Sequence, residues 1–155
     1  MAPPRLPQIY IARLVPLLAT LPALAGADAE QRGAFRQATY LDWHFRSTTG
    51  FDWDLPAHEL ATHLLGSAAN VVPAYDGPRQ GWSALGEIGA ALLAAPSVGP
   101  ADREFLAALI VRYQLIRWDR PGVAVPADLR AVLARVPPQP PPNWEGGMFP
   151  PTMQR

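Results

Sequence analysis

The residues best suited by type to metal chemistry are His58 and His63, which lie in a stretch with helical periodicity. A zinc-protease helix carries two histidines at i and i+4, so that both rings reach one metal ion from the same face. Here the spacing is i and i+5, which turns the second ring away from the first. The chain has no cysteine, and its one further histidine is His44. We therefore interpret both residues as ordinary helix histidines and expect neither a metal nor another cofactor.

Two acidic pairs, Asp52/Asp54 and Asp102/Glu104, are the candidates for acid–base catalysis. Such catalysis needs a carboxyl group that a pocket holds at a raised pKa. The first pair lies in a sequence typical of a turn, and the second lies in the opening turn of an expected helix. Capping and stabilisation of the helix dipole explain both pairs. Because no phosphate loop, nucleophile elbow or Ser/His/Asp set stands out either, the sequence favours a protein that is not an enzyme.

The composition indicates one globular domain, since 49% of the 155 residues are hydrophobic. Thirteen basic residues, all of them arginine, balance 13 acidic residues. A nucleic-acid-binding protein normally has a basic excess, so this balance predicts no nucleic-acid partner. No uninterrupted apolar run is long enough to span a bilayer, and we expect no membrane partner. The lack of cysteine excludes disulfides but does not decide the compartment.

Hydrophobic periodicity predicts an all-α fold, a single small bundle of about six helices. The bundle is organised around residues 81–116, which we interpret as two amphipathic helices in an antiparallel hairpin. Pro96, Gly99 and Pro100 interrupt the periodicity between the two helices. The expected core positions of the hairpin are Leu85, Ile88, Leu92, Leu93, Phe105, Leu106, Leu109, Ile110 and Tyr113.

Four further helices are expected, in residues 9–21, 28–46, 56–69 and 126–136. In the first of them, the inward-facing residues should be Ile9, Leu14, Leu17, Leu18 and Leu21. Residues 137–155 are rich in proline, which favours extended polyproline II structure. We therefore divide the chain into a helical domain, residues 1–136, and a linker or docking tail, residues 137–155.

The first 27 residues permit a second interpretation, a secretory signal peptide. Arg5 and Arg13 would form its charged region, and residues 14–24 its apolar core, before a small-residue cleavage site at 25–27. Pro16 and Pro22 interrupt that apolar core, so we favour a first helix of the domain and a cytoplasmic protein. The alternative is a secreted or periplasmic helical binding protein.

Four residues are candidates for contacts with a protein partner: Arg112, Arg117, Trp118 and Trp144. Arginine pairs well with carboxylates across interfaces, and tryptophan and arginine are enriched in hot spots. Trp144 lies in the proline-rich tail, where little local core is available to it. The alternatives are that Trp118 packs inward, that the arginines are solvated, and that Trp144 is a linker residue.

A series of hydrophobic and turn residues resembles bacterial effector-associated domains. The residues that carry this resemblance are Leu21-Pro22-Ala23-Leu24, Glu30, Arg32, Phe35, Trp53, Glu59-Leu60-Ala61, Leu64-Leu65, Asp76-Gly77, Ala84-Leu85, Leu92-Leu93, Val98-Gly99 and Leu109-Ile110. The resemblance covers residues 14–116. The chain departs from the family pattern in a longer loop at 71–80 and in the additional helix after Pro126.

The resemblance implies a small, non-enzymatic adaptor of a bacterial conflict or immunity system. In that family a helical domain on a sensor is thought to recruit a matching helical domain on an effector, as death-fold adaptors do. The partner implied is therefore another helical domain. A small structural subunit of a larger assembly is the remaining alternative for this chain.

Overall fold

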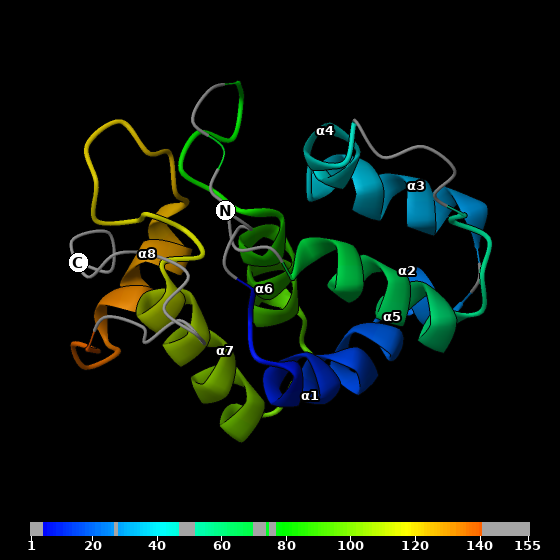
Figure 1. Cartoon of the computed structure of the whole chain (residues 1–155), viewed down its shortest axis with the longest axis horizontal. Coiled ribbons are helices and arrows are strands. Elements are labelled where there is room, and N and C mark those ends of the chain that lie inside the picture. The colour runs from blue at the N-terminus through cyan, green and yellow to red at the C-terminus, as the bar shows by residue number, and fades with distance from the viewer. Residues whose placement is uncertain (1–4, 27, 47–51, 70–73, 75–76, 141–155) are drawn as a thin grey trace.

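The computed structural model describes residues 5–26, 28–46, 52–69, 74 and 77–140 (Figure 1). All regular secondary structure in these parts of the chain is helical, which confirms the prediction of a small all-α bundle. The helices are α1 (Gln8–Ala19), α2 (Pro22–Ala25), α3 (Ala29–Ala38), α4 (Leu41–His44), α5 (Ala57–Ala68), α6 (Ala84–Ala94), α7 (Pro100–Tyr113) and α8 (Ala127–Ala134). Across the described ranges, none of them is both long and apolar enough to cross a membrane.

The described residues contain eight helices where about six were expected, because a short unpredicted helix follows the first one and the second predicted helix is divided. The first ends at Ala19, and Pro22 begins α2 at a position where its missing N–H costs no hydrogen bond. The second is interrupted at Tyr40, whose φ of 52° lies in the left-handed region. A left-handed residue cannot continue a right-handed helix, so α3 ends and α4 begins on a new axis.

The predicted central hairpin is present as α6 and α7. All its expected core positions are buried except Phe105, which is half-buried. The second helix is shorter than expected, since Gln114 takes a left-handed conformation, with φ 53°, and ends α7. The chain then runs back beside the start of α6, where the Ser83 hydroxyl donates to the Leu115 carbonyl over 2.8 Å. Gly86 allows this close approach, because it has no side chain facing Leu115.

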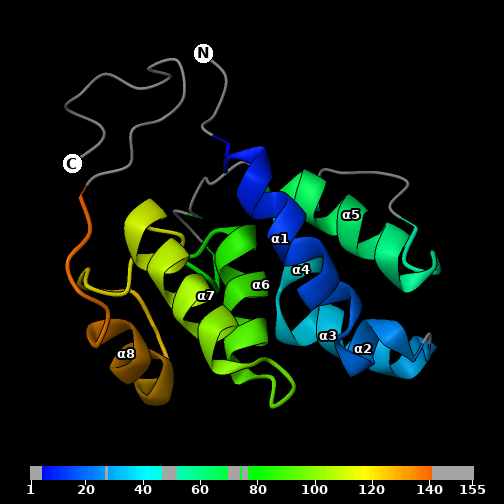
Figure 2. The ribbon, with the colours of Figure 1, turned by 90° about the horizontal axis from the view of Figure 1, so that it is seen from below.

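The N-terminal half is built on the packing of α1 against α5, with α2 to α4 beyond them (Figure 2). The buried face of α1 consists of Ile11, Leu14, Val15 and Leu18. The expectation that Ile9 faces inward is wrong: its side chain is 75% exposed. The buried face of α1 begins at Ile11 instead, and Leu6, before the helix, is buried in the core as well.

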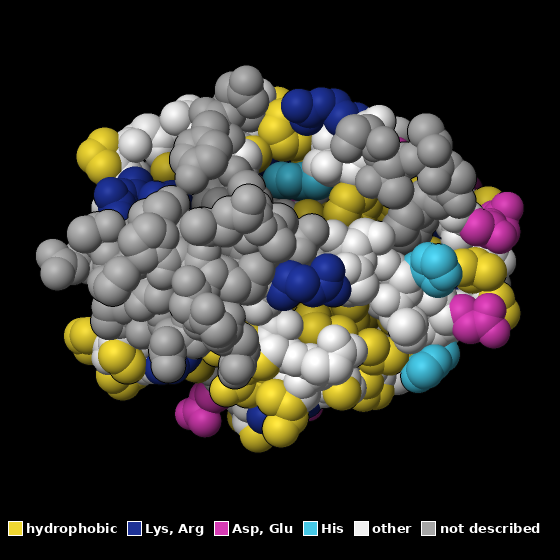
Figure 3. Space-filling view, in the orientation of Figure 1, with side chains coloured by type: hydrophobic (Ala, Val, Ile, Leu, Met, Phe, Trp, Pro, Cys, Tyr) yellow, Lys and Arg dark blue, Asp and Glu magenta, His cyan; other side chains and the backbone are white. Residues whose placement is uncertain are grey.

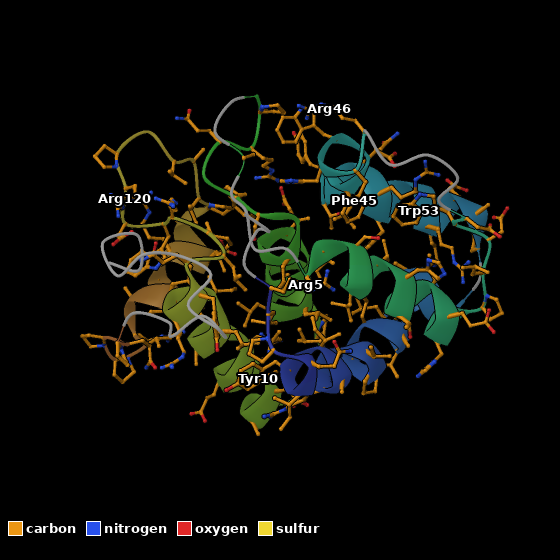
Figure 4. The ribbon with its side chains drawn as sticks, viewed as in Figure 1. Arg5, Tyr10, Phe45, Arg46, Trp53 and Arg120 are labelled. Atoms are coloured by element: carbon orange, nitrogen blue, oxygen red, sulfur yellow. The ribbon has the colours of Figure 1, made fainter. Side chains whose placement is uncertain are left out.

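Aromatic contacts join α1 to the central hairpin. Tyr10 lies beside α7, its ring 5.9 Å from that of Phe105 and 6.1 Å from that of Tyr113 (Figure 4). The Arg13 guanidinium lies 3.8 Å from the centre of the Phe105 ring and also pairs with Asp102 over 3.1 Å. These contacts hold the two halves of the bundle together along one side of α7.

A buried arginine connects α3 to the two segments beside it. Arg32 is only 4% exposed. Its guanidinium donates to three carbonyl oxygens, those of Leu24, Trp53 and Leu55, at 2.7 to 2.8 Å. Hydrogen bonds from a cation to carbonyl groups are stronger than neutral ones. Arg32 therefore acts as a structural cross-link, and its charge is committed to the backbone.

Candidate functional site

A surface hollow of about 460 Å³ lies between α3, α6 and α8. Three small residues of α6, Ala90, Ala91 and Ala94, form part of its lining, so we call it the alanine hollow. Leu129 and Val132 of α8 also line it. The volume is in the range of a ligand pocket, about 300–1,000 Å³. The hollow is thus large enough to accept several side chains of a partner.

A second hollow of about 550 Å³ lies farther along α8, between α7 and the segment that follows α8. Leu93, Arg103 and Val132 line both hollows. Arg103 has a structural task there, since its guanidinium donates to the carbonyls of Leu93, Ala95 and Val98 around the end of α6. It satisfies carbonyl groups that the helix end leaves open.

One end of the alanine hollow holds a buried carboxylate, Glu87 of α6, which is 2% exposed. Its Oε2 atom lies 3.2 Å from Nε2 of His44 and 3.2 Å from Nε of Arg79. The His44 contact is a hydrogen bond, and it ties α4 to α6. The Arg79 contact has the distance of an ion pair without hydrogen-bond geometry, so the Arg79 Nε–H has no acceptor among the described residues.

Two aromatic rings lie against the Arg79 guanidinium. Its central carbon lies 4.4 Å from the ring centre of Tyr40 and 4.4 Å from that of Trp82. Trp82 is fixed by a 2.9 Å hydrogen bond from its indole N–H to the Ala124 carbonyl. We call Tyr40, Trp82 and Glu87 the cation cage, because they surround Arg79 with two aromatic faces and a carboxylate.

The loop that carries Arg79 is packed closely against α4. Gly77 has a φ of 87°, and a side chain on it would overlap the Trp43 ring. On the outer side of α4, Arg46 stacks over the same Trp43 ring at 4.4 Å (Figure 4). The three residues of the cation cage come from three segments. Tyr40 follows α3, Trp82 lies in the loop before α6, and Glu87 belongs to α6.

Burial raises the pKa of Glu87 above its ordinary value of 4.5, although the hydrogen bond from His44 and the charges of Arg79 and His44 act to lower it. His44 and Arg79 thus compensate only part of the hydration that the Glu87 carboxylate loses on burial. A carboxyl group in a hollow with a perturbed pKa and specific partners is a candidate functional group. Glu87 is the only residue of this kind that the described residues show in either hollow.

The stability of the fold should fall as pH rises through the raised pKa of Glu87, because the folded state holds this proton more tightly than the unfolded state. The test compares the free energy of unfolding of two variants, His44→Gln and His44→Gln/Glu87→Gln. Neither variant has a histidine at position 44, so His44 does not contribute to the pH dependence of their difference. The double variant should gain stability relative to the single one from pH 4 upward. Urea unfolding at several pH values measures the difference, and parallel curves would show that Glu87 titrates normally.

Polar side chains that line the alanine hollow make hydrogen bonds within the chain. The Thr39 hydroxyl, which lines the alanine hollow, is committed to the Phe35 carbonyl over 2.6 Å. Within the described ranges, no three His, Cys, Asp or Glu side chains come together as a metal site. What the hollow does offer is apolar surface over small side chains, with a carboxylate and aromatic faces at one end.

The partner candidates chosen from the sequence lie elsewhere. Arg112 is half-buried, with its guanidinium 5.7 Å from the centre of the Tyr113 ring. Trp118 is also half-buried and packs against the core, and Arg117 donates its backbone N–H to the Gly81 carbonyl. None of the three lines either hollow. Trp144 lies outside the described residues.

The histidines and acidic pairs considered first are not brought together with Glu87. His58 and His63 are exposed on α5. Asp52 accepts a hydrogen bond from the backbone N–H of Asp54, as expected in a turn. Sequence reasoning missed Glu87, whose signal was its place as the one charged residue of α6.

Comparison with protein-family models, with curated proteins and with solved structures finds no match to this chain. The resemblance to bacterial effector-associated domains accordingly stays a prediction from the sequence.

Proposed function

We propose that this chain is a non-enzymatic adaptor that binds a helix of a partner protein in the alanine hollow. The observation that supports this most directly is the lining of the hollow by three alanines of α6, Ala90, Ala91 and Ala94, together with Leu129 and Val132 of α8. Small side chains on one helix allow a second helix to approach closely. An amphipathic helix lying in such a groove anchors itself by apolar residues spaced three or four apart.

The distribution of charge also favours a protein partner. On the face shown in Figure 3, the described arginines lie apart from one another, among hydrophobic and neutral side chains. A nucleic-acid interface requires a continuous basic surface. With the family resemblance, this supports a helical domain as the partner and recruitment in a bacterial conflict system as the role.

The compartment that fits this role is the cytoplasm, with the N-terminal segment retained. Leu14, Leu18 and Leu24 are buried in the core, and removal of a signal peptide would take all three away. Intact-mass spectrometry of the protein from its native host should therefore show that residues 1–27 are present. A mature chain that begins near Asp28 would overturn this part of the proposal.

A pull-down with the whole chain as bait, against proteins encoded beside its gene, tests the proposed function. We expect recovery of a helical-domain protein by the wild type and by Ala134→Arg, and its loss with Ala94→Arg. Ala94 lines the hollow, whereas Ala134 is exposed on α8 and lines neither hollow. Loss with Arg112→Glu instead would move the interface to the end of α7, and failure to recover any helical-domain partner would contradict the proposal.

A further inference from the structure

The cation cage combines three features that together recognise a guanidinium group. The ring centres of Tyr40 and Trp82 each lie 4.4 Å from the central carbon of the Arg79 guanidinium. Glu87 supplies a carboxylate that is almost fully buried. Aromatic faces attract cations, and a desolvated carboxylate strengthens that attraction. We infer that the cage is a binding site for an alkylguanidinium cation, that Arg79 occupies it in the free chain, and that an arginine of the bound partner helix takes its place.

Arg79 fills the cage imperfectly. Its Nε–H is buried but has no hydrogen-bond acceptor among the described residues, although Oε2 of Glu87 is 3.2 Å away. The same oxygen also accepts the hydrogen bond from His44. An arginine facing a carboxylate squarely would instead use both oxygens through two parallel N–H groups. The cage therefore leaves binding energy that a better-aligned guanidinium can gain.

The cage opens toward the place where the partner would lie. Arg79, Trp82 and Glu87 all line the alanine hollow. The Arg79 side chain is 22% exposed, so its route to solvent is short. A helix bound over Ala90 and Ala91 could extend an arginine into the cage while Arg79 moves out. This step rests on the proposed function, because it needs a helix in the hollow.

The geometry selects arginine over lysine. A planar guanidinium stacks on aromatic faces and keeps its N–H groups at its edge for the carboxylate. An ammonium group is compact and strongly hydrated, so it gains less from two flat faces. The cage consequently specifies the chemistry of the partner: an amphipathic helix that carries one arginine among its apolar anchors.

The test removes the Arg79 side chain from the cation cage and supplies methylguanidinium as a small ligand in its place. In Arg79→Ala, methylguanidinium chloride should bind saturably, shifting the NMR signal of the Trp82 indole N–H and raising the melting temperature above that in matched NaCl. Arg79→Gln serves as the second variant if Arg79→Ala does not fold without the ligand. Wild-type protein should bind the probe at least about tenfold more weakly, since Arg79 competes, and Arg79→Ala/Glu87→Gln should lose about as much.

Equal effects of methylguanidinium and NaCl would overturn the inference, as would undiminished binding by the double variant or by the wild type. Methylammonium that bound as tightly as methylguanidinium would overturn the selectivity for arginine. These results do not depend on a partner. A failure here therefore leaves the adaptor proposal standing, and a failed pull-down leaves the cage to be judged by its own ligand.

Discussion

Replacing Arg32 by methionine should lower the free energy of unfolding by about 3 kcal/mol, because buried carbonyl groups without a donor each cost about 1–3 kcal/mol. The three carbonyls of Leu24, Trp53 and Leu55 would lose the donor that they share. Methionine fills much of the space but donates nothing, and removing the buried charge offsets part of the loss. Urea unfolding of the wild type and the variant measures the difference.

Arg36 on the same helix provides the matched control. It pairs with Asp42 over 3.1 Å at the surface, where its own side chain is 36% exposed. Arg36→Met should therefore cost no more than about 1 kcal/mol. If both variants lost the same stability, Arg32 would not be the cross-link that its hydrogen bonds indicate.

Replacing Gly86 by alanine should destabilise the fold by about 3 kcal/mol, since overpacking a close contact typically costs about 1–3 kcal/mol or more. A methyl group at this position would collide with the Leu115 carbonyl and come within 2.8 Å of Ile116 Cγ1. The first obstacle is backbone, which cannot rotate away as a side chain can. The start of α6 and the segment after α7 would have to separate, and thermal unfolding should show it.

Gly66 on α5 is the control for this second prediction. It is also helical, but a methyl group there would meet nothing within 4 Å. Gly66→Ala should stabilise the fold by about 0.5–1 kcal/mol, because alanine is the better helix former. Opposite signs for the two substitutions would establish the close approach at Gly86, whereas a stabilising Gly86→Ala would refute it.

The helical core could be predicted from the sequence because it depends on local periodicity. Leu85, Ile88 and Leu92 recur on one face of a helix, and each is buried in the structure. Pro22 was interpreted only as an interruption of the apolar run at 14–24, and the short helix that it begins was not predicted. The end of α3 before Tyr40 could not be predicted from the sequence. Tyr40 takes the left-handed conformation, for which tyrosine has no intrinsic preference.

The candidate site depends on contacts that sequence spacing does not encode. His44 and Glu87 are 43 positions apart and meet only because α4 packs on α6. Arg79 joins them from a loop whose turn signals say nothing about its neighbours. The partner candidates were chosen for residue type, and the structure places Trp118 against the core. Burial and concavity, which mark the hollow, follow only from the assembled fold.

The measurement that bears most directly on the proposed function is the affinity of the recovered helical-domain partner for three forms of the chain. Isothermal titration calorimetry should give Ala94→Arg a dissociation constant at least about tenfold higher than the wild type, a loss of about 1.4 kcal/mol. Ala134→Arg should bind within about twofold of the wild type, as surface substitutions outside an interface do. If a folded Ala94→Arg bound its partner as tightly as the wild type, the alanine hollow would not be the binding site.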